Sequence, residues 1–459
     1  MADLPHGHVR SAMCSRAPAA GVAPAQVAVS GFKHAAVQLM CAAVLANQRL
    51  RLMNCPDVED VRVIAEILHR AGADVEHRDG VLRLDPSGLG EVELDPELAG
   101  AVHGALYLLP ALVVRQGRAV VPQTGGCSLD GTAVGRPVAH MVEVLRTFGA
   151  RVDVDNARLT ATADGLRGAV LDIRDFSDEV DVVSGPRVSG ATKCALLCAL
   201  GAMGQSIIRH AYRKPDVTEL VLMANRAGAD VRWEGGDLWV RRSLHDEASP
   251  TEDRPKEVVH ELVPCCSELM TCVAYGVLAG QSLVIHCNSP GRLVEGFPEE
   301  VELMRRIGVP LSYGDRTIEL SVGPELTLRP MTIDVTSRDI YSDNQPFFAL
   351  MATHGEAGAI STIRERVWAG RFTYADELRK IGAVMARSAE GRNELTITRS
   401  EWKGGGDLHA ADLRSAATLL VAACAQSQPS RVSGLEHLPR GYPDLCASLR
   451  RCGALIEET

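Results

Sequence analysis

The sequence lacks an uncharged apolar run long enough to span a bilayer, although 46% of its 459 residues are hydrophobic. It also lacks an excess of positive charge, because 48 Lys and Arg stand against 58 Asp and Glu, a formal net charge of −10. We therefore expect no membrane segment and no nucleic-acid partner, since no basic stripe is present to meet a phosphate backbone. The hydrophobic fraction suffices for substantial cores, and the length favours two or three domains.

Two further features are missing. The first 25 or so residues contain no continuous apolar stretch of the kind that secretory signals have, and we interpret them as a ragged extension. The 13 cysteines are odd in number and include no zinc-like CxxC pairs. Free, mostly buried thiols fit a reducing compartment, so we expect a cytoplasmic protein.

What the sequence does contain is one short phrase repeated six times: an apolar run, a glycine, a small residue and usually a strand. The copies are ILHRAGADVEH, VLRTFGARVDV, MANRAGADVRW, LMRRIGVPLSY, LRKIGAVMARS and LRRCGALIEE, around Gly72, Gly149, Gly228, Gly308, Gly382 and Gly453. The glycines stand 71 to 80 residues apart, so the chain is predicted to consist of six copies of one α/β unit.

Each copy has the same internal order. A run rich in Ala, Leu and Gly, apolar nearly all round, predicts a buried helix, and a strand follows it. Next comes an amphipathic helix ending at the repeated glycine, which suits a left-handed helix end, and then a pair of alternating strands. We expect two α/β domains of three βαβαββ-type subdomains each, with helices inside and sheets facing out. We assign 31–245 to the first domain, 1–30 and 255–459 to the second, and the polar stretch 241–257 to the linker region.

The sharpest local signal is TGGCSLDGTAVGRPV, residues 124–138, in which glycines surround Cys127 and precede Arg136. Glycines this dense indicate a loop, where a cysteine is accessible and a nearby arginine favours its thiolate. An incidental thiol on a surface loop is the alternative interpretation.

Cationic residues stand at several helix starts. Lys33 and His34 open the first buried helix in SGFKHAA, where backbone N–H groups already favour an anion. Arg414 in ADLRSAA and Arg440 in PRGYPDL are predicted to enter helices, and Arg371 lies on the glycine-flanked segment WAGRF. Arginine suits bidentate capture of phosphate or carboxylate. Each of these residues taken singly is more simply a surface residue, whereas several at equivalent repeat positions leave a shared anion site as an equal alternative.

Asp343 begins the fifth buried helix in SRDIYSDNQPFF. A helix N-cap is the ordinary role for an aspartate there. The functional alternative is a base or an acceptor that orients a substrate hydroxyl.

These motifs resemble those of the enolpyruvyl transferases, and most closely the MurA branch. The resemblance runs from about residue 27 to the C-terminus and rests on SGFKHAA, the GGC and GRPV segments, DNQPFF, ADLRSAA, PRGY and the six glycine phrases. It implies two inside-out α/β domains that close on the substrate, and it implies no metal or organic cofactor.

The resemblance also implies roles for individual residues. The phosphoenolpyruvate-binding residues would be Lys33, Arg136, Arg371, Arg414 and Arg440, with Arg371 also helping to hold the closed state. Cys127 would be the lid cysteine, which protonates the methylene carbon or assists product release, and Lys33 would act beside it. Asp343 would take the proton of the acceptor hydroxyl.

The nucleotide side departs from the family pattern. The nucleotide-binding positions would be His34, His103, Pro137, Val138, Arg187, Ser189 and Gly190. His34 replaces a family asparagine, His103 replaces an arginine, and Ala139-His140 replace an Asp-Leu pair that contacts uracil. The Cys127 loop is about four residues longer than in the family.

Because the donor side is largely kept and the acceptor side has drifted, the resemblance favours a changed acceptor. We expect transfer to the 3′-hydroxyl of UMP, as in nucleoside-antibiotic assembly, by a protein that works as a monomer. UDP-N-acetylglucosamine, the acceptor of peptidoglycan synthesis, is the alternative. A nucleotide-binding relative without catalytic activity is the alternative of another class.

Overall fold

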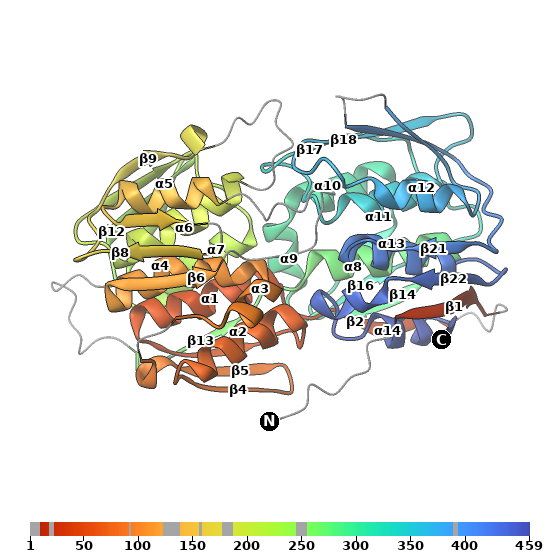
Figure 1. Cartoon of the computed structure of the whole chain (residues 1–459). Coiled ribbons are helices and arrows are strands. Elements are labelled where there is room, and N and C mark those ends of the chain that lie inside the picture. The colour runs from red at the N-terminus through yellow and green to blue at the C-terminus, as the bar shows by residue number, and fades with distance from the viewer. Residues whose placement is uncertain are drawn as a thin grey trace. The chain divides into compact units, whose positions relative to one another are not determined.

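The computed structural model of the chain describes residues 10–17, 23–90, 93–122, 138–155, 158–176, 187–244, 255–388 and 393–459. These residues divide into two compact units, one within 31–263 and the other formed by the described residues of 10–30 and by 264–459 (Figure 1). Each unit repeats one α/β subdomain three times, which confirms the predicted fold class.

The unit within 31–263 contains three successive copies. The first has α1 (Lys33–Ala46), β3 (Arg49–Met53), α2 (Glu59–Arg70), β4 (Asp74–Arg78), β5 (Val81–Asp85) and the 3-10 turn η1 (Pro86–Gly88). The second has α3 (Pro96–Ala101), η2 (His103–Tyr107), α4 (Leu108–Gln116), β6 (Arg118–Pro122), α5 (Ala139–Thr147), β7 (Arg151–Val154) and β8 (Arg158–Thr162). The third has β9 (Val170–Asp172), η3 (Ile173–Phe176), α6 (Arg187–Gly201), β10 (Ser206–Arg209), α7 (Pro215–Arg226), β11 (Asp230–Glu234) and β12 (Asp237–Arg242), and β13 (Glu257–Glu261) completes the unit.

The other unit opens with β1 (Ser11–Arg16) and β2 (Ala25–Ala28). Its first copy has α8 (Cys266–Ala279), β14 (Leu283–His286), α9 (Pro290–Gly296), α10 (Pro298–Ile307), β15 (Leu311–Tyr313) and β16 (Thr317–Leu320). The second has β17 (Thr332–Val335), α11 (Gln345–Ala352), β18 (Ile360–Glu365), α12 (Thr373–Arg379), β19 (Val384–Arg387) and β20 (Glu394–Thr398). The third has β21 (Asp407–His409), α13 (Leu413–Cys424), β22 (Ser430–Ser433), η5 (Leu435–Arg440), α14 (Leu445–Arg451) and β23 (Ala454–Glu458).

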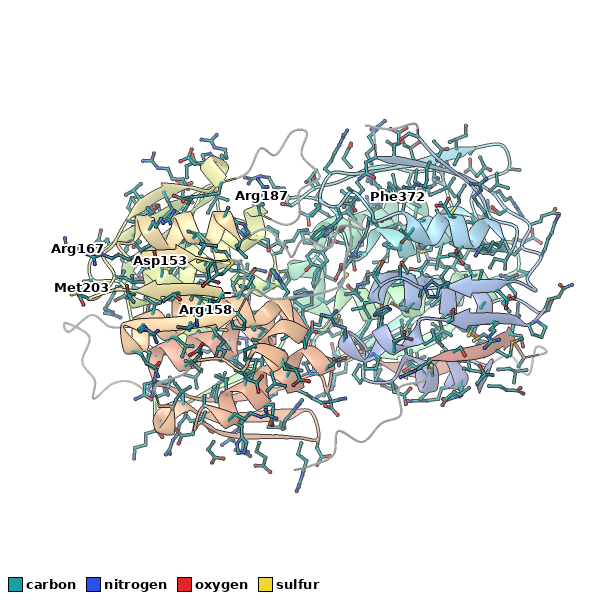
Figure 2. The ribbon with its side chains drawn as sticks, in the orientation of Figure 1. Asp153, Arg158, Arg167, Arg187, Met203 and Phe372 are labelled. Atoms are coloured by element: carbon teal, nitrogen blue, oxygen red, sulfur yellow. The ribbon has the colours of Figure 1, made fainter. Side chains whose placement is uncertain are left out.

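The core of each unit is a set of three inner helices packed on one another, α1 with α4 and α6 in one unit and α8 with α11 and α13 in the other (Figure 1). Every residue of α8 and α13 is buried, as expected for helices that are apolar all round. The sheets form the outer layer, and buried and exposed side chains alternate along their strands. On β7 and β8, Val152 and Leu159 are buried, whereas Asp153 and Arg158 are exposed (Figure 2). The helices therefore lie inside and the strands outside, the reverse of the usual α/β arrangement.

Sheet pairing follows one rule in five of the sheets. The strand after each inner helix pairs in parallel with one neighbour and antiparallel with a hairpin strand, as in the orders β13-β3-β5-β4, β17-β18-β20-β19 and β15-β16-β14-β2. The parallel neighbour of β3 is β13, and that of β14 is β2, so in each unit a sheet includes a strand from a distant part of the chain. The sequence assignment placed all residues from 255 onward in the second domain, whereas β13 pairs within the unit of 31–263.

The interpretation of the N-terminal residues as a ragged extension was wrong for residues 11–16. They form β1, which lies between β22 and β23 in the order β21-β22-β1-β23. Ala12 and Cys14 are fully buried there. In the sixth copy β23 follows Gly453, and β1 pairs with it in the position of the second hairpin strand.

The repeated glycines behave as predicted. Gly72, Gly149, Gly228, Gly308, Gly382 and Gly453 have φ between 90° and 107°, the left-handed region that ends helices. The cysteines within the described ranges are all free and buried. None of the helices within those ranges combines the length and apolar character needed to cross a bilayer.

Candidate active site

In the unit that contains 264–459, three of the predicted site residues come together, two of them at the N-terminal ends of inner helices. Asp343 lies just before α11, Arg414 lies in the first turn of α13, and Arg371 lies between β18 and α12. The start of α13 is fixed by Asp412, whose carboxylate caps the helix by accepting from the backbone N–H groups of Arg414 (2.8 Å) and Ser415 (3.1 Å).

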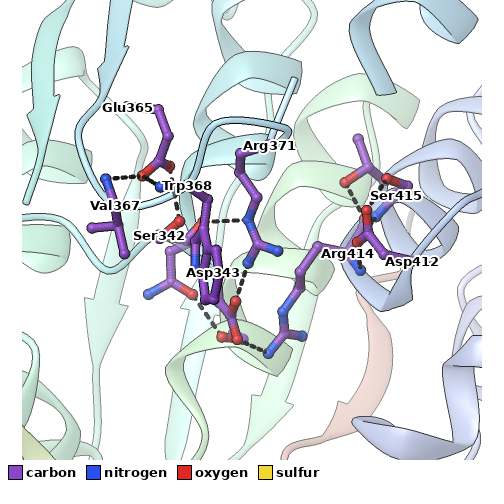
Figure 3. Close-up of polar contacts among 12 residues, drawn as sticks. Ser342, Asp343, Glu365, Val367, Trp368, Arg371, Asp412, Arg414 and Ser415 are labelled. Carbon is purple, nitrogen blue, oxygen red and sulfur yellow. Dashed lines mark hydrogen bonds and ion pairs between the residues drawn. The ribbon is translucent and has the colours of Figure 1, made fainter. Parts of the chain in front are cut away.

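The three side chains form one ion-paired cluster (Figure 3). Arg371 Nη2 donates to Asp343 Oδ1, and Arg414 Nη2 donates to Asp343 Oδ2 at 2.7 Å. Both guanidinium groups are buried, with 3% and 4% of each residue exposed. Arg371 Nε also donates to the backbone carbonyl of Ser342 at 3.3 Å. One carboxylate therefore bridges two buried cations, a strong arrangement for arginine.

The two arginines and one aspartate of the cluster carry a net positive charge. Burial by itself would lower the pKa of Arg414, but Asp343 reverses this effect and the pKa lies well above its usual range. The pKa of Arg371 is raised in the same way, by Asp343, Asp412 and Glu365 against the effect of burial. Both guanidinium groups therefore remain charged across the pH range in which proteins are folded, and an anionic ligand would find two fixed cations here.

Tyr442 supports Arg414 from the other side. Its hydroxyl accepts from Arg414 Nη1 at 3.0 Å and lies 2.8 Å from Thr271 Oγ1. The Nε–H of Arg414 is buried and has no hydrogen-bond partner among the described residues. Arg414 is thus held in place by Asp343 and Tyr442, neither of which uses its Nε–H.

Two local predictions about this unit were wrong. Asp343 is not the N-cap of α11, because Asn344 occupies that position and the Asp343 carboxylate turns to the arginines. Arg440 does not enter a helix, since it is the last residue of η5, and Pro443 delays the next helix until Leu445. Arg440 is half-buried, two residues before Tyr442.

In the unit within 31–263, Lys33 and His34 open α1 as predicted. Lys33 is buried, and its Nζ donates to Asp60 Oδ2 at 2.7 Å. His34 is half-buried, with its ring 5.2 Å from that of Phe32 in an edge-on arrangement. His103 begins η2, because the predicted second buried helix is interrupted at Val102, which is extended at φ −130° and ψ 130°.

The start of α6 gathers the other described nucleotide-binding candidates. Arg187 is its first residue (Figure 2), and Ser189 and Gly190 follow it in the buried first turn. His140 of α5 packs over Gly190, since a Cβ atom there would lie 2.2 Å from His140 Nε2. Val138 directly precedes α5. Burial, with the charges of Arg187 and Lys193, lowers the pKa of His140 to about 4, so the imidazole is neutral at neutral pH.

The predicted residues Cys127, Arg136 and Pro137 lie outside the described residues, as does most of the linker region 241–257. In the part of the chain that the structure describes, no three His, Cys, Asp or Glu side chains are grouped to hold a metal ion.

The sequence analysis did not identify several residues that lie beside Lys33 or around the arginine cluster. They are Asp60, which pairs with Lys33, and Glu365, Asp412 and Tyr442 around the arginine cluster. Asp412 and Tyr442 stand inside motifs already singled out, ADLRSAA and PRGY, and an N-cap search would have found Asp412. Glu365 carries no such signal.

Known proteins resemble the chain over nearly its whole length. The family model for EPSP synthase (3-phosphoshikimate 1-carboxyvinyltransferase) matches residues 21–449. UDP-N-acetylglucosamine 1-carboxyvinyltransferase 2 of Bacillus subtilis is 28% identical over 436 residues, 94% of this chain and 93% of that protein. The protein of the same name from Mesorhizobium japonicum is 29% identical over 438 residues, 94% of this chain and 96% of that protein.

Solved structures agree. The enolpyruvyl transferase NikO from Streptomyces tendae superposes with a TM-score of 0.86 at 32% identity, covering 98% of this chain and 99% of that one. EPSP synthase from Acinetobacter baumannii superposes with a TM-score of 0.68 over 97% of this chain and 100% of that one, and at 15% identity this likeness shows the fold alone.

These matches define the class as enzymes that transfer an enolpyruvyl (carboxyvinyl) group. Within that class, the chain belongs to the EPSP synthase family, in its MurA-like branch.

Proposed function

We propose that the enzyme transfers the enolpyruvyl group of phosphoenolpyruvate to a hydroxyl of a uridine nucleotide with release of phosphate. The proposed acceptor is the 3′-hydroxyl of UMP, in the assembly of a nucleoside antibiotic. The observation that carries the reaction type is the cluster of Arg371, Arg414 and Asp343, which combines two buried cations for an anionic donor with a carboxylate base. Membership of the family supports phosphoenolpyruvate as the donor.

The proposed chemistry is addition followed by elimination. A proton added to the methylene carbon, from Cys127, makes C2 electrophilic, and the acceptor oxygen attacks C2 while Asp343 takes the hydroxyl proton. The tetrahedral adduct then loses a proton from the new methyl group and breaks the C2–O bond to phosphate. Arg371, Arg414, Arg440, Arg136 and Lys33 would stabilise the phosphate and carboxylate charges throughout.

Both oxygens of the Asp343 carboxylate are held by arginines, one by Arg371 and the other by Arg414. Anionic groups of the donor compete for the same guanidinium N–H groups. We expect donor binding to loosen the arginine contacts of Asp343, which frees a carboxylate oxygen to accept the proton of the acceptor hydroxyl.

The acceptor is inferred from the unit within 31–263. The start of α6 offers backbone N–H groups and Arg187 to a phosphate, and the neutral His140 ring covers Gly190 beside them. His34 and His103 stand where the family has asparagine and arginine. These substitutions favour a smaller nucleotide over a nucleotide sugar.

UDP-N-acetylglucosamine is the second candidate acceptor. Curated relatives at 28% and 29% identity carry its name, and the likeness spans 94% of this chain. If this acceptor is correct, the three histidine substitutions are tolerated variation within the family pattern.

The test is phosphate release from phosphoenolpyruvate with UMP, UDP-N-acetylglucosamine or shikimate 3-phosphate supplied in parallel. Release with UMP alone supports the proposal, and release with UDP-N-acetylglucosamine alone overturns its acceptor. The variant His34→Asn restores the family residue, and we expect it to lower the rate with UMP relative to that with UDP-N-acetylglucosamine. Met203→Ala, an exposed residue on the outer surface of the same unit, is the matched control and should leave this ratio unchanged.

A further inference from the structure

Glu365 is a buried carboxylate that lies behind the arginine cluster and that the proposed chemistry does not use. It is the last residue of β18 and is fully buried. Three donors converge on it: Ser342 Oγ at 2.8 Å, the backbone N–H of Val367 at 2.8 Å and that of Trp368 at 3.1 Å (Figure 3). A carboxyl group has two oxygens with room for several donors, so it suits this position.

These contacts join two segments that each carry a site residue. Ser342 precedes Asp343, while Val367 and Trp368 lead to Arg371. At one end the segments are linked by the Glu365 side chain. At the other end Arg371 reaches back to the carbonyl of Ser342 and the carboxylate of Asp343. The result is a closed ring of hydrogen bonds in which neither segment can shift without stretching a contact at both ends.

We propose that Glu365 is a positioning residue for enolpyruvyl transfer, which holds the Asp343 segment and the Arg371 segment in register. This inference rests on the proposed roles of Asp343 as base and Arg371 as donor contact. Reactive geometry is demanding, because a misplacement of about 1 Å can lower the rate roughly 100-fold. A residue that fixes both partners therefore acts on the rate without touching the substrate.

The Glu365 side chain is not the only support of the turn in which it lies. The backbone of the turn after β18 has its own support, since Asn393 Nδ2 donates to the carbonyls of Glu365 (2.7 Å) and Trp368 (2.9 Å). Burial of a carboxylate is costly and raises the pKa of Glu365 to about 7, with Arg371 acting in the opposite direction. Removal of the side chain should leave the turn folded but release Ser342.

The experiment compares Glu365→Gln, Glu365→Ala and Ser342→Ala with wild type, using phosphate release with the acceptor that the wild type accepts. We expect Glu365→Ala to lower kcat roughly 10- to 100-fold per folded molecule, because both links to Ser342 and to the turn are lost. Glu365→Gln keeps a side chain of the same shape with an acceptor oxygen, so kcat should stay within about 5-fold of wild type. Ser342→Ala breaks one link only and should fall between them.

Ile363→Val is the matched control. Ile363 is fully buried two positions earlier on β18, and its shortening removes a buried methyl group without touching the ring. A Glu365→Ala enzyme with wild-type kcat would overturn the inference. So would equal losses in Glu365→Gln and Glu365→Ala, since these would assign the effect to charge. If Glu365→Ala does not fold, an unchanged kcat in Ser342→Ala overturns it instead.

A second readout separates this inference from the proposed function. The rise in Tm caused by phosphoenolpyruvate needs no acceptor and is measured on the same variants. Wild type that releases no phosphate with any acceptor would refute the proposed function alone. The inference about Glu365 then stands if Glu365→Ala loses most of the donor-induced shift while Glu365→Gln retains it, and it fails if the two variants respond alike.

Discussion

Asp343 supplies the negative charge that partly neutralises the two arginines of the cluster. Arg371 and Arg414 are both nearly fully buried, and Asp343 pairs with each of them directly. Buried charges need a partner, because the cost of removing an ion from water is several kcal/mol when it is not compensated. Asp343 therefore has two tasks, as the proposed base and as the counterion of both arginines.

Asp343→Asn should separate these tasks. We expect a loss of about 3–5 kcal/mol in the free energy of unfolding, because two buried cations lose their shared counterion. Inorganic phosphate should recover part of this loss by binding the released guanidinium groups, and turnover should fall at least 100-fold. The measurement is thermal unfolding with and without phosphate. Asp334→Asn, which removes a half-exposed partner of Arg364, should cost less than 1 kcal/mol. An equal phosphate effect in Asp343→Asn and wild type would contradict this account.

At this scale, motifs could predict the residues that bind charge, and little else. Arg371, Arg414 and Asp343 were singled out through the resemblance of the chain to a family, because each of them taken singly is also explained as a surface residue or a helix N-cap. Glu365 could not be found, since its role depends on which segments meet at the end of β18. Arg440 was predicted to enter a helix but ends η5, a position that depends on the prolines around it.

At the scale of the element, the repeated glycine is what made the fold predictable. Each copy needs a left-handed residue after its amphipathic helix so that the chain can turn back into the hairpin. All six glycines adopt this conformation. A local requirement of this kind leaves a mark in the sequence, because residues with a side chain pay a steric cost there.

Gly149→Ala isolates that cost. Gly149 has φ of 93° after α5, and an added Cβ atom would meet nothing within 4 Å. We expect a loss of about 1 kcal/mol from backbone strain alone. The control is Gly100→Ala, in helix α3 with equally open space, which should stabilise by about 0.5–1 kcal/mol. Denaturant unfolding of both variants measures the difference, and a loss of equal size in both would argue against strain at Gly149.

Strands that pair with a distant part of the chain have no comparable signal in the sequence. The strand β1 pairs with β22 and β23, more than 400 residues away in the chain, and its six residues alone gave no reason to expect this partner. The same holds for β2 beside β14 and β13 beside β3. A repeat that is closed by a distant strand is predictable only once the missing position in its sheet is known.

Removal of residues 1–17 should therefore destabilise the last copy. The truncated chain loses β1 from the middle of its sheet, so β23 loses its hydrogen-bonded neighbour and the buried Ala12 and Cys14 are no longer there to pack. We expect a lower Tm, by at least about 5 °C, and early proteolysis within 454–458. Met13→Lys changes the half-buried side of β1 without removing its backbone pairing and should have a much smaller effect. Truncation without a change in Tm would refute the importance of β1.

At the scale of the whole molecule, buried titratable groups of opposite sign act on stability together. Burial raises the pKa of Glu268 and of Glu365 to about 7, from the ordinary value of 4.5. Burial also lowers the pKa of His140 and His354 to about 4, from 6.5, with nearby arginines contributing. Between about pH 4.5 and 6.5 the carboxylates lower the free energy of unfolding as pH rises, while the histidines raise it. The two effects act in opposite directions over the same pH range, so the pH profile of the wild type does not separate them.

A single substitution isolates the contribution of one carboxylate to the pH dependence of stability. Glu268 is buried at the start of α8, where its carboxylate accepts from the backbone N–H of Ser30 at 3.0 Å and from the Ser30 hydroxyl. The folded protein keeps the Glu268 proton up to about pH 7, whereas the unfolded chain loses it near 4.5. The folded state thus binds more protons in this window, and its stability falls as pH rises through it. Glu268→Gln cannot titrate, so the variant should gain stability relative to wild type between pH 5 and pH 8.

Denaturant unfolding at pH 5, 6, 7 and 8 measures the difference. Glu302→Gln is the control, because the exposed Glu302 has a lowered pKa beside Arg305 and is already ionised throughout. A Glu268→Gln difference that stays constant with pH would show that this carboxylate is ionised in the folded protein, and its hydrogen bonds to Ser30 would then have to outweigh the effect of burial.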